Sequence, residues 1–320
     1  MHDTPPPAAP QFTAERHPGN PIITPAMMGN PDENINGPSL IRVPGWVRRP
    51  LGRYYLYFAH HEGSYIRLAY ADDVRGPWRI HAPGVLHVRE AGWNPDHVAS
   101  PDVLIDDESR QIRLYFHAPV TPVPKSTDPD YQERLLQARQ ESFVALSDDG
   151  LCFRVRGESL GPSYFRVWRW QDHYYALPRL ASPLLRSRDG ITDFRRAARS
   201  PFDGDPAFRD IRHVAVYARG PQLTVFYTRI GDAPEQIGCA SIDMSGDWES
   251  WRASPPRRVL RPEKDYEGAS LSIAPSLRGA VTGPEHALRD PAVYEENGVL
   301  YLLYSVAGER GIALATLRPV

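Results

Sequence analysis

Arg289-Asp290-Pro291-Ala292-Val293-Tyr294 is followed after a turn by Leu300-Tyr301-Leu302-Leu303-Tyr304, and this pair of segments is the last of five similar copies. Each copy has an apolar segment marked at its start by proline or histidine, then a turn, then a segment rich in aromatic residues. The first segments of the other copies begin at Gly37, Ser100, Gly161 and Arg212. Regular self-similarity of this kind indicates a repeat architecture, so the chain is predicted to contain five similar units.

The length of the chain suits five small sheets. Dividing the 320 residues by five gives about 64 per unit, which is enough for four short strands and their connections. The strand-like segments are short, rich in β-branched and aromatic residues, and separated by turns such as Asp149-Gly150 and Asp189-Gly190, a pattern typical of antiparallel sheets. The sequence therefore predicts an all-β fold, a five-bladed β-propeller of four-stranded antiparallel blades in a single domain.

The repeat also predicts where the blades lie. An irregular N-terminal segment is expected over residues 1–20 and the propeller over 21–320, with blades at about 36–88, 97–156, 161–198, 211–253 and 288–317. Only three strands are recognisable in the fifth blade, which would leave an open sheet edge. The N-terminal segment, near residues 21–24, is expected to supply the missing outer strand. Residues 128–141 break the pattern with helix-forming residues after Asp-Pro, and they predict a surface insertion or the wall of a pocket.

Composition excludes several classes of function. The 37 basic and 39 acidic residues nearly balance, which gives no electrostatic basis for binding nucleic acid or an anionic membrane. No apolar run approaches the ~18 residues of a membrane span, and the Pro-rich N-terminus lacks the apolar core of a signal peptide. A soluble, cytoplasmic protein is expected. Cys152 and Cys239 are expected to be buried free thiols rather than a disulfide.

Connectivity predicts which end of the propeller binds a ligand. In an antiparallel blade, the start of the first strand and the end of the second strand lie at the same end. Polar residues gather at those places, and the opposite ends are ordinary turns. The predicted substrate-binding residues are Asp32, Glu33, Asn36, His61, His97, His117, Tyr164, Arg166, Arg212, His213 and Arg229. Second-strand ends also place Arg179, Ser305 and Glu309 at this end, without a role assigned to them.

Three carboxylates are predicted to be catalytic: Asp102, Asp290 and Glu267. Asp102 and Asp290 are expected at equivalent places on the innermost strands, and Asp is unfavourable inside a strand, so its presence there indicates function. Glu267 lies on a long irregular loop entering the fifth unit. Two carboxyl groups flanking a bond are what glycoside hydrolysis requires.

Motifs of other chemistries are missing from the sequence. It contains no Gly-rich phosphate loop, no His-Glu-x-x-His helix and no Gly-x-Ser-x-Gly elbow. No cofactor is required, and no metal ligands are assigned. The histidines of the predicted face leave room for a central metal ion, although no motif supports one.

The blade phrases resemble those of the five-bladed β-propeller glycoside hydrolases, namely the arabinanase/β-xylosidase family 43, the invertase/levansucrase families and the mannoside phosphorylases. Asn20-Pro21-Ile22-Ile23, Ser100-Pro101-Asp102-Val103 and Arg289-Asp290-Pro291-Ala292-Val293 carry the resemblance. It implies that Asp102 modulates the catalytic acid and orients the substrate. The place of the family's base reads Gly37-Pro38, and the place of its acid reads Leu160-Gly161-Pro162. Both family catalysts are therefore missing from their usual places, and the chain is identified as a diverged member.

The sequence thus predicts a glycoside hydrolase that cleaves a terminal bond of an oligosaccharide or glycoside. Glu267 is interpreted as the acid, Asp290 as the base or nucleophile, and Asp102 as the residue that orients and tunes. Two alternatives remain. A phosphorylase would use Arg166, Arg212, His213 and Arg229 to bind phosphate, and a non-catalytic sugar-binding propeller would explain the missing family catalysts.

Overall fold

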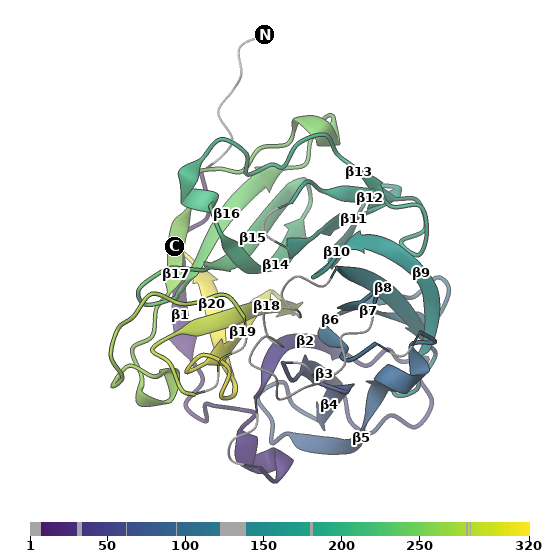
Figure 1. Ribbon diagram of the computed structural model, residues 1–320, viewed down its shortest axis with the longest axis horizontal. Helices are drawn as coiled ribbons and strands as arrows, with labels where there is room; N and C mark the ends of the chain where they lie inside the picture. Colours follow the sequence, from purple (N-terminus) through teal and green to yellow (C-terminus); the bar gives the residue numbers. More distant parts are fainter. Residues whose placement is uncertain are drawn as a thin grey trace.

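The computed structural model describes residues 8–30, 34–61, 63–93, 95–121, 139–179, 182–279, 281 and 283–320. In these ranges twenty strands form five four-stranded antiparallel sheets. Figure 1 shows the sheets arranged around a central axis, with the first strand of each blade innermost. The prediction of an all-β, five-bladed propeller is confirmed. The predicted insertion at 128–141 lies outside the described residues up to residue 138, and Gln140 and Glu141 already belong to a strand.

The strands follow one another blade by blade. Blade one contains β2 (Asn36–Arg42), β3 (Tyr54–Ala59), β4 (Tyr65–Ala71) and β5 (Arg79–His87). Blade two contains β6 (Ala99–Asp106), β7 (Gln111–Pro119), β8 (Gln140–Ser147) and β9 (Arg154–Pro162). Blade three contains β10 (Arg166–Trp170), β11 (His173–Leu177), β12 (Leu185–Ser187) and β13 (Arg195–Arg196).

Blade four contains β14 (Ile211–Arg219), β15 (Gln222–Arg229), β16 (Ile237–Asp243) and β17 (Arg257–Leu260), and blade five contains β18 (Leu288–Glu296), β19 (Val299–Val306), β20 (Ile312–Pro319) and β1 (Phe12–Arg16). Short 3-10 turns connect them at η1 (Pro25–Met28), η2 (Val88–Glu90), η4 (Pro206–Phe208), η5 (Trp248–Ser250) and η6 (Asp265–Glu267). No helix in the described part of the chain has the length and hydropathy needed to cross a bilayer.

The first strand of the sequence closes the last blade. β1 pairs antiparallel with β20, with Phe12 opposite Pro319 and Arg16 opposite Ala315. The prediction that the N-terminal segment completes blade five is confirmed, but the position was wrong, because the strand lies at 12–16 rather than 21–24. Residues 1–20 are therefore not irregular throughout. Alternate residues of β1 are half-buried, and the Phe12 ring lies 5.5 Å from that of Phe226 in blade four, so β1 has an inward face to bury.

The aromatic second strands hold neighbouring blades together. Tyr57 of β3 and Tyr115 of β7 are fully buried, with apolar residues of two blades around them. The Tyr57 hydroxyl donates to the carbonyl of Gly150 in blade two at 2.9 Å, and the Tyr115 hydroxyl donates to Gly190 in blade three at 2.8 Å. Both glycines have a left-handed backbone, φ 75° and 72°. The predicted Asp-Gly turns are thus acceptors for the next blade as well as turns.

The two cysteines differ from their prediction in part. Both are free thiols, and Cys239 is buried, but Cys152 is exposed. Cys152 lies in the turn just after Asp149, whose carboxylate accepts a hydrogen bond from the Cys152 amide at 2.9 Å. The residue is therefore held at a turn between β8 and β9, where its side chain faces solvent.

Replacing Tyr57 with Phe should lower the free energy of unfolding by about 1–2 kcal/mol, because the buried Gly150 carbonyl loses its donor. Urea unfolding measures this difference. Tyr70→Phe is the control, since Tyr70 is half-buried and its hydroxyl donates no hydrogen bond within the described ranges. Equal stability of Tyr57→Phe and the wild type would show that the hydroxyl does not link the blades.

Candidate functional site

A backbone irregularity shapes the same end of four innermost strands. The strand pairing skips between Asn36 and Ser39, Ala99 and Asp102, Ile211 and Val214, and Arg289 and Ala292. In blades one, two and five a left-handed residue precedes a proline at this skip: Gly37 (φ 58°), Ser100 (φ 49°) and Asp290 (φ 47°). Such bulges re-aim side chains, and left-handed non-glycine residues tend to cluster at functional sites.

This register corrects one prediction. Asp290 corresponds to Gly37 and Ser100, whereas Asp102 corresponds to Ser39 and Ala292. Asp102 and Asp290 are therefore not equivalent, because one follows its proline and the other precedes it. In blade three Tyr164 (φ 67°) takes the place of Asp290, with the Arg179 amide donating to the Ser163 carbonyl at 2.9 Å.

Asp290 lies buried near the axis with two partners. Its side chain is 3% exposed, Oδ1 forms an ion pair with Nδ1 of His213 in blade four, and Oδ2 accepts a hydrogen bond from Ser305 at 3.2 Å. Burial opposes ionisation, but the neighbouring His213 holds the pKa of Asp290 below its usual value. Asp290 is thus an oriented, ionised carboxylate.

Glu309 is a second buried carboxylate at this end, on the loop between β19 and β20. Its Oε2 accepts hydrogen bonds from Asn34 and, at 3.4 Å, from Asn36, and it lies 3.4 Å from Nδ1 of His61. Its Oε1 lies 3.6 Å from the guanidinium of Arg289. Although burial opposes ionisation, His61 and Arg289 hold the pKa of Glu309 well below its usual range. The negative charge of Glu309 partly opposes the lowering of the Asp290 pKa by His213, so the two carboxylates are close neighbours.

A row of rings leads to Asp290 from the other blades. His117 lies 5.9 Å from His97 and 4.2 Å from Tyr164, and Tyr164 lies 4.7 Å from His213. Burial and the neighbouring His97 lower the pKa of His117 well below its usual value, so its imidazole is neutral at neutral pH. Burial and the charge of Asp290 raise the pKa of Tyr164 to about 12. Neutral hydrogen-bonding groups therefore lie beside two charged carboxylates.

Arg166 and Asp102 link blade three to blades two and four. The Arg166 guanidinium donates to the carbonyls of Val214 in blade four at 2.9 Å and Pro101 in blade two at 3.2 Å. Arg166 is 4% exposed, so its guanidinium is bound to backbone rather than presented to a substrate. Asp102 Oδ2 accepts the Val167 amide at 2.7 Å. Burial raises the pKa of Asp102 even though Arg166 lies nearby.

The remaining predicted arginines are engaged with protein groups. Glu235 is fully buried and binds Arg212 Nε at 2.9 Å and Arg289 Nε at 3.0 Å. Arg212 also donates to the carbonyl of Leu277. Arg229 donates to the carbonyl of Ala207 at 2.8 Å and lies 3.5 Å from Asp232.

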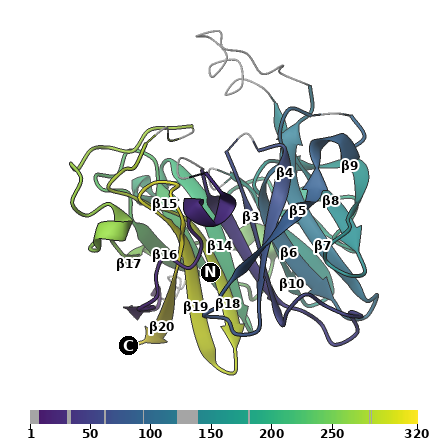
Figure 2. The same ribbon diagram turned by 90° about the horizontal axis from the view of Figure 1, so that it is seen from below.

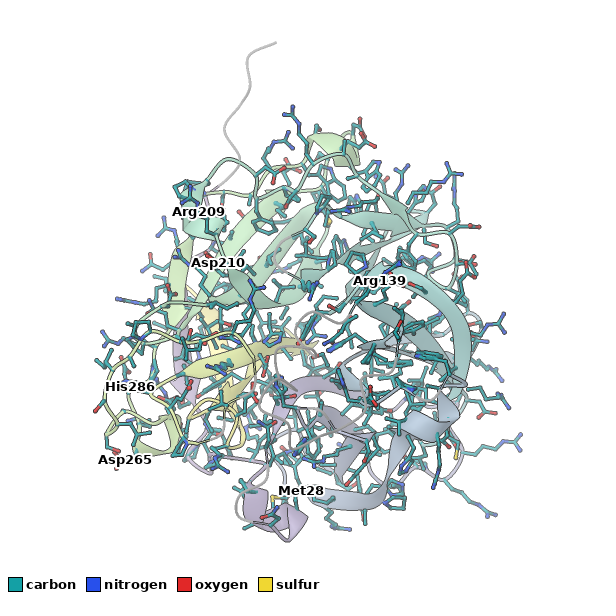
Figure 3. The ribbon with its side chains drawn as sticks, in the orientation of Figure 1. Met28, Arg139, Arg209, Asp210, Asp265 and His286 are labelled. Atoms are coloured by element: carbon teal, nitrogen blue, oxygen red, sulfur yellow. The ribbon has the colours of Figure 1, made fainter. Side chains whose placement is uncertain are left out.

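Glu267 does not join the other predicted carboxylates. Its carboxylate accepts hydrogen bonds from Arg16 of β1 at 2.7 Å and from the Tyr304 hydroxyl at 2.9 Å, and from the amides of Glu263 and Lys264 at 2.8 and 3.0 Å. Asp265, at the start of the same turn, lies at the periphery in Figure 3. Glu267 therefore ties the loop to the closing strand. Asp32 and Glu33 lie outside the described residues.

Sequence reasoning placed Asn36, His61, His97, His117, Tyr164, His213 and Asp290 at one end, and the structure brings these residues together. It missed Glu309 as a functional carboxylate and Asn34 as its partner. The signal was available, because Glu309 follows the second strand of blade five at the predicted end. Figure 2, turned by 90° from Figure 1, shows loops gathered at that end and the β18–β19 turn at the other.

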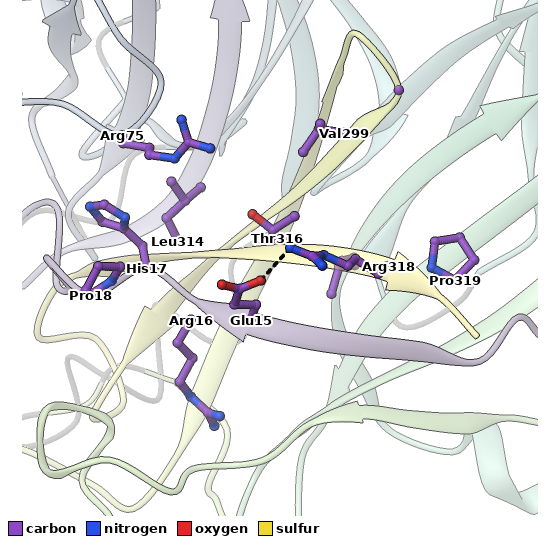
Figure 4. Close-up of a pocket in the computed structure, with 12 residues that line it drawn as sticks. Glu15, Arg16, His17, Pro18, Arg75, Val299, Leu314, Thr316, Arg318 and Pro319 are labelled. Carbon is purple, nitrogen blue, oxygen red and sulfur yellow. Dashed lines mark hydrogen bonds and ion pairs between the residues drawn. The ribbon is translucent and has the colours of Figure 1, made fainter.

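No three His, Cys, Asp or Glu side chains among the described residues are grouped so as to hold a metal ion. A cavity of about 450 Å³ lies away from the axis, at the outer edge of blade five (Figure 4). It is lined by β1 and β20 and by residues including His17, Arg75 and Thr316. It contains none of the axial residues, and its Glu15–Arg318 ion pair is largely exposed.

The chain is similar to a known protein in sequence and to many solved structures in fold. No protein-family model matches the chain. It is 34% identical over 332 residues to the uncharacterised protein R118 of Acanthamoeba polyphaga mimivirus. The match covers 94% of this chain and 89% of that protein.

Several solved structures with a similar fold are described as glycoside hydrolases. CoXyl43, a GH43 β-xylosidase/α-arabinofuranosidase from a compost microbial metagenome, was solved with xylotriose and matches 96% of this chain and 98% of its own, at a TM-score of 0.60 and 14% identity. A putative glycoside hydrolase of Parabacteroides distasonis matches 96% of both chains, at a TM-score of 0.62 and 12% identity. The GH43_1 enzyme of Xanthomonas citri, solved with xylose, matches 98% of this chain and 90% of its own, at a TM-score of 0.57 and 14% identity.

Glu235→Gln should lower the free energy of unfolding by about 3–5 kcal/mol, because two buried guanidinium groups lose their shared counter-charge. Urea unfolding with intrinsic fluorescence measures the loss. Glu15→Gln is the control, since its pair with Arg318 is 68–70% exposed, and such pairs contribute little. A loss no larger than that of the control would contradict the inferred role of Glu235.

The lowered pKa of Glu309 predicts how stability depends on pH. A carboxyl with a pKa lower in the folded than in the unfolded state stabilises the fold above about pH 4.3, and that contribution is lost as pH falls towards the folded value. Glu309→Gln should therefore be less stable than wild type at pH 7, and the difference should shrink below about pH 4. Urea midpoints at pH 7, 5, 4 and 3 test this. A difference that stays constant would argue against the ionised state of Glu309.

Proposed function

Since the chain belongs to the same family as mimivirus protein R118 and has the five-bladed propeller fold of the glycoside hydrolases, we propose that it hydrolyses a terminal glycosidic bond of a carbohydrate bound at the axial end. The observation that carries the proposal is the pair of buried, ionised carboxylates, Asp290 and Glu309, beside the rings of Tyr164 and His213. Glycoside hydrolysis uses carboxyl groups on either side of the scissile bond.

Asp290 is assigned the role of base or nucleophile. Its ion pair with His213 and its hydrogen bond from Ser305 orient it, and its lowered pKa keeps it ionised. Asp290-Pro291 repeats in blade five the left-handed backbone of Gly37-Pro38 in blade one. That is the place where the resemblance to family 43 puts the base, which supports a catalytic carboxylate moved to another blade.

The other two carboxyl groups are assigned different tasks. Glu309 is ionised as well, so it suits stabilisation of the positive charge that develops on the sugar ring rather than proton donation. Asp102 is the carboxyl whose pKa burial raises. Because a raised pKa favours the role of a proton donor over that of a base, Asp102 is assigned to supply or tune the proton given to the leaving group. Glu267 is left out, because its oxygens are bound to Arg16, Tyr304 and its own loop.

A non-catalytic carbohydrate-binding propeller is the second candidate. It is favoured by Gly37, which stands without a carboxylate at the place where the resemblance to family 43 puts the base. It is also favoured by Leu160, which is 5% exposed and packs in the core between blades two and three at the place of the family's acid. In this case the axial groups would bind a sugar without cleaving it.

A panel of aryl furanosides and pyranosides, assayed with and without phosphate, tests the function. We expect release of the aryl group without phosphate, and a fall in kcat/KM of roughly 10²–10⁴-fold in Asp290→Asn. Asp73→Asn, 60% exposed at a turn of blade one, should retain full activity. Thermal unfolding of both variants verifies that they are folded. Sugar binding with no cleavage of any glycoside would select the second candidate, and turnover that requires phosphate would indicate a phosphorylase.

A further inference from the structure

We propose that the sugar bound at the axial end is acidic, carrying a carboxylate as a uronic acid does, and that Arg179 binds this carboxylate. The inference rests on the proposed carbohydrate site and names its substrate class. It concerns a residue that the assigned chemistry does not use.

Arg179 is anchored at the rim of the site. It follows β11, at the end of the second strand of blade three, and its amide donates to the Ser163 carbonyl at 2.9 Å. The next residue after Ser163 is Tyr164, whose ring contacts both His117 and His213. The side chain of Arg179 is half-buried. Its positive charge lowers the pKa of His117 and counteracts the rise in that of Tyr164, so it lies within electrostatic reach of both.

Among the described residues of this site, Arg179 is a cation without a counter-charge. Within the described part of the chain its guanidinium makes no hydrogen bond and no ion pair. Arg289 is held by Glu235 and Glu285, Arg212 by Glu235, and Asp290 and Glu309 each have their own histidine. Partly buried charges in proteins are normally paired, so a charge left over at a ligand site favours an anionic ligand.

His117 supplies the second observation. It is 2% exposed, and its Nδ1 has no hydrogen-bond partner in the described ranges. A neutral imidazole both donates and accepts hydrogen bonds, which suits a sugar hydroxyl. In the described part of the chain, an unpaired guanidinium thus lies within electrostatic reach of a neutral imidazole whose Nδ1 lacks a partner. This combination matches a ligand that carries a carboxylate and hydroxyl groups together.

The charge at the site favours a carboxylate over phosphate. A planar guanidinium binds a carboxylate through two parallel hydrogen bonds, and one free arginine balances one negative charge. A phosphate dianion would need further cations beside two ionised carboxylates. Arg166, Arg212 and Arg229, which the sequence nominated for phosphate, are already bound to carbonyl groups or to carboxylates.

Calorimetric binding to the Asp290→Asn protein tests the inference without any need for turnover. The ligands are D-glucuronate and D-galacturonate, the neutral sugars glucose, galactose and xylose, and inorganic phosphate. We expect at least one acidic sugar to bind roughly tenfold or more tightly than its neutral counterpart, since hydrogen bonds to charged groups contribute at this level. Arg179→Gln should remove that preference and leave neutral-sugar binding unchanged, and Arg179→Lys should retain part of it.

Arg188→Gln is the matched control, because Arg188 is 75% exposed in the same blade and pairs with Asp172. The Arg188→Gln variant should prefer acidic over neutral sugars as strongly as the Asp290→Asn protein does. Equal or tighter binding of the neutral sugars, no binding of any sugar, or phosphate binding that Arg179→Gln abolishes would each overturn the inference. Cleavage of neutral aryl glycosides with no preference for uronides would overturn it while the hydrolase function stands. Acidic-sugar binding through Arg179 without cleavage of any glycoside would remove the hydrolase function and leave the inference standing.

Discussion

The pairing of β1 with β20 is the interaction on which the rest of the structure depends. A propeller blade with three strands would leave an open edge, and here the first strand of the chain fills it. The same strand carries Arg16, which binds Glu267 and so fixes the loop that leads into blade five. Blade five then supplies Asp290 and Glu309, so the axial carboxylates depend on a ring that the N-terminus closes.

Charge pairing organises the axial end. Each buried carboxylate there has a cationic or polar partner from another blade: His213 for Asp290, and His61 with Asn34 for Glu309. Glu235 is the shared carboxylate partner of Arg212 and Arg289. Because burying an unpaired charge is costly, these pairs favour one relative placement of blades one, four and five. Arg179 differs from Arg212 and Arg289, because its guanidinium has no carboxylate partner among the described residues.

The likeness to the GH43 hydrolases concerns the fold, at 12–14% identity. Within this chain, Gly37 in blade one and Asp290 in blade five share a left-handed backbone before a proline. Blades one, two and five place this backbone position at the same end of the axis, and of these three positions Asp290 alone carries a carboxylate. Repetition of the blade thus allows side chains to differ at matching backbone positions while the architecture stays the same.

The sequence by itself determined the five blades, the aromatic second strands and the end at which His61, His117, His213 and Asp290 meet, because alternation, turns and strand direction are local properties that repeat. It did not distinguish Glu267 from Glu309. That difference was decided by the tertiary structure, in which Arg16, 251 residues away, neutralises Glu267, and Asn34, 275 residues away, orients Glu309. The register of Asp102 against Asp290, and the paired or unpaired state of each arginine, also depend on contacts between blades. Such contacts join residues far apart in sequence, so no local pattern records them.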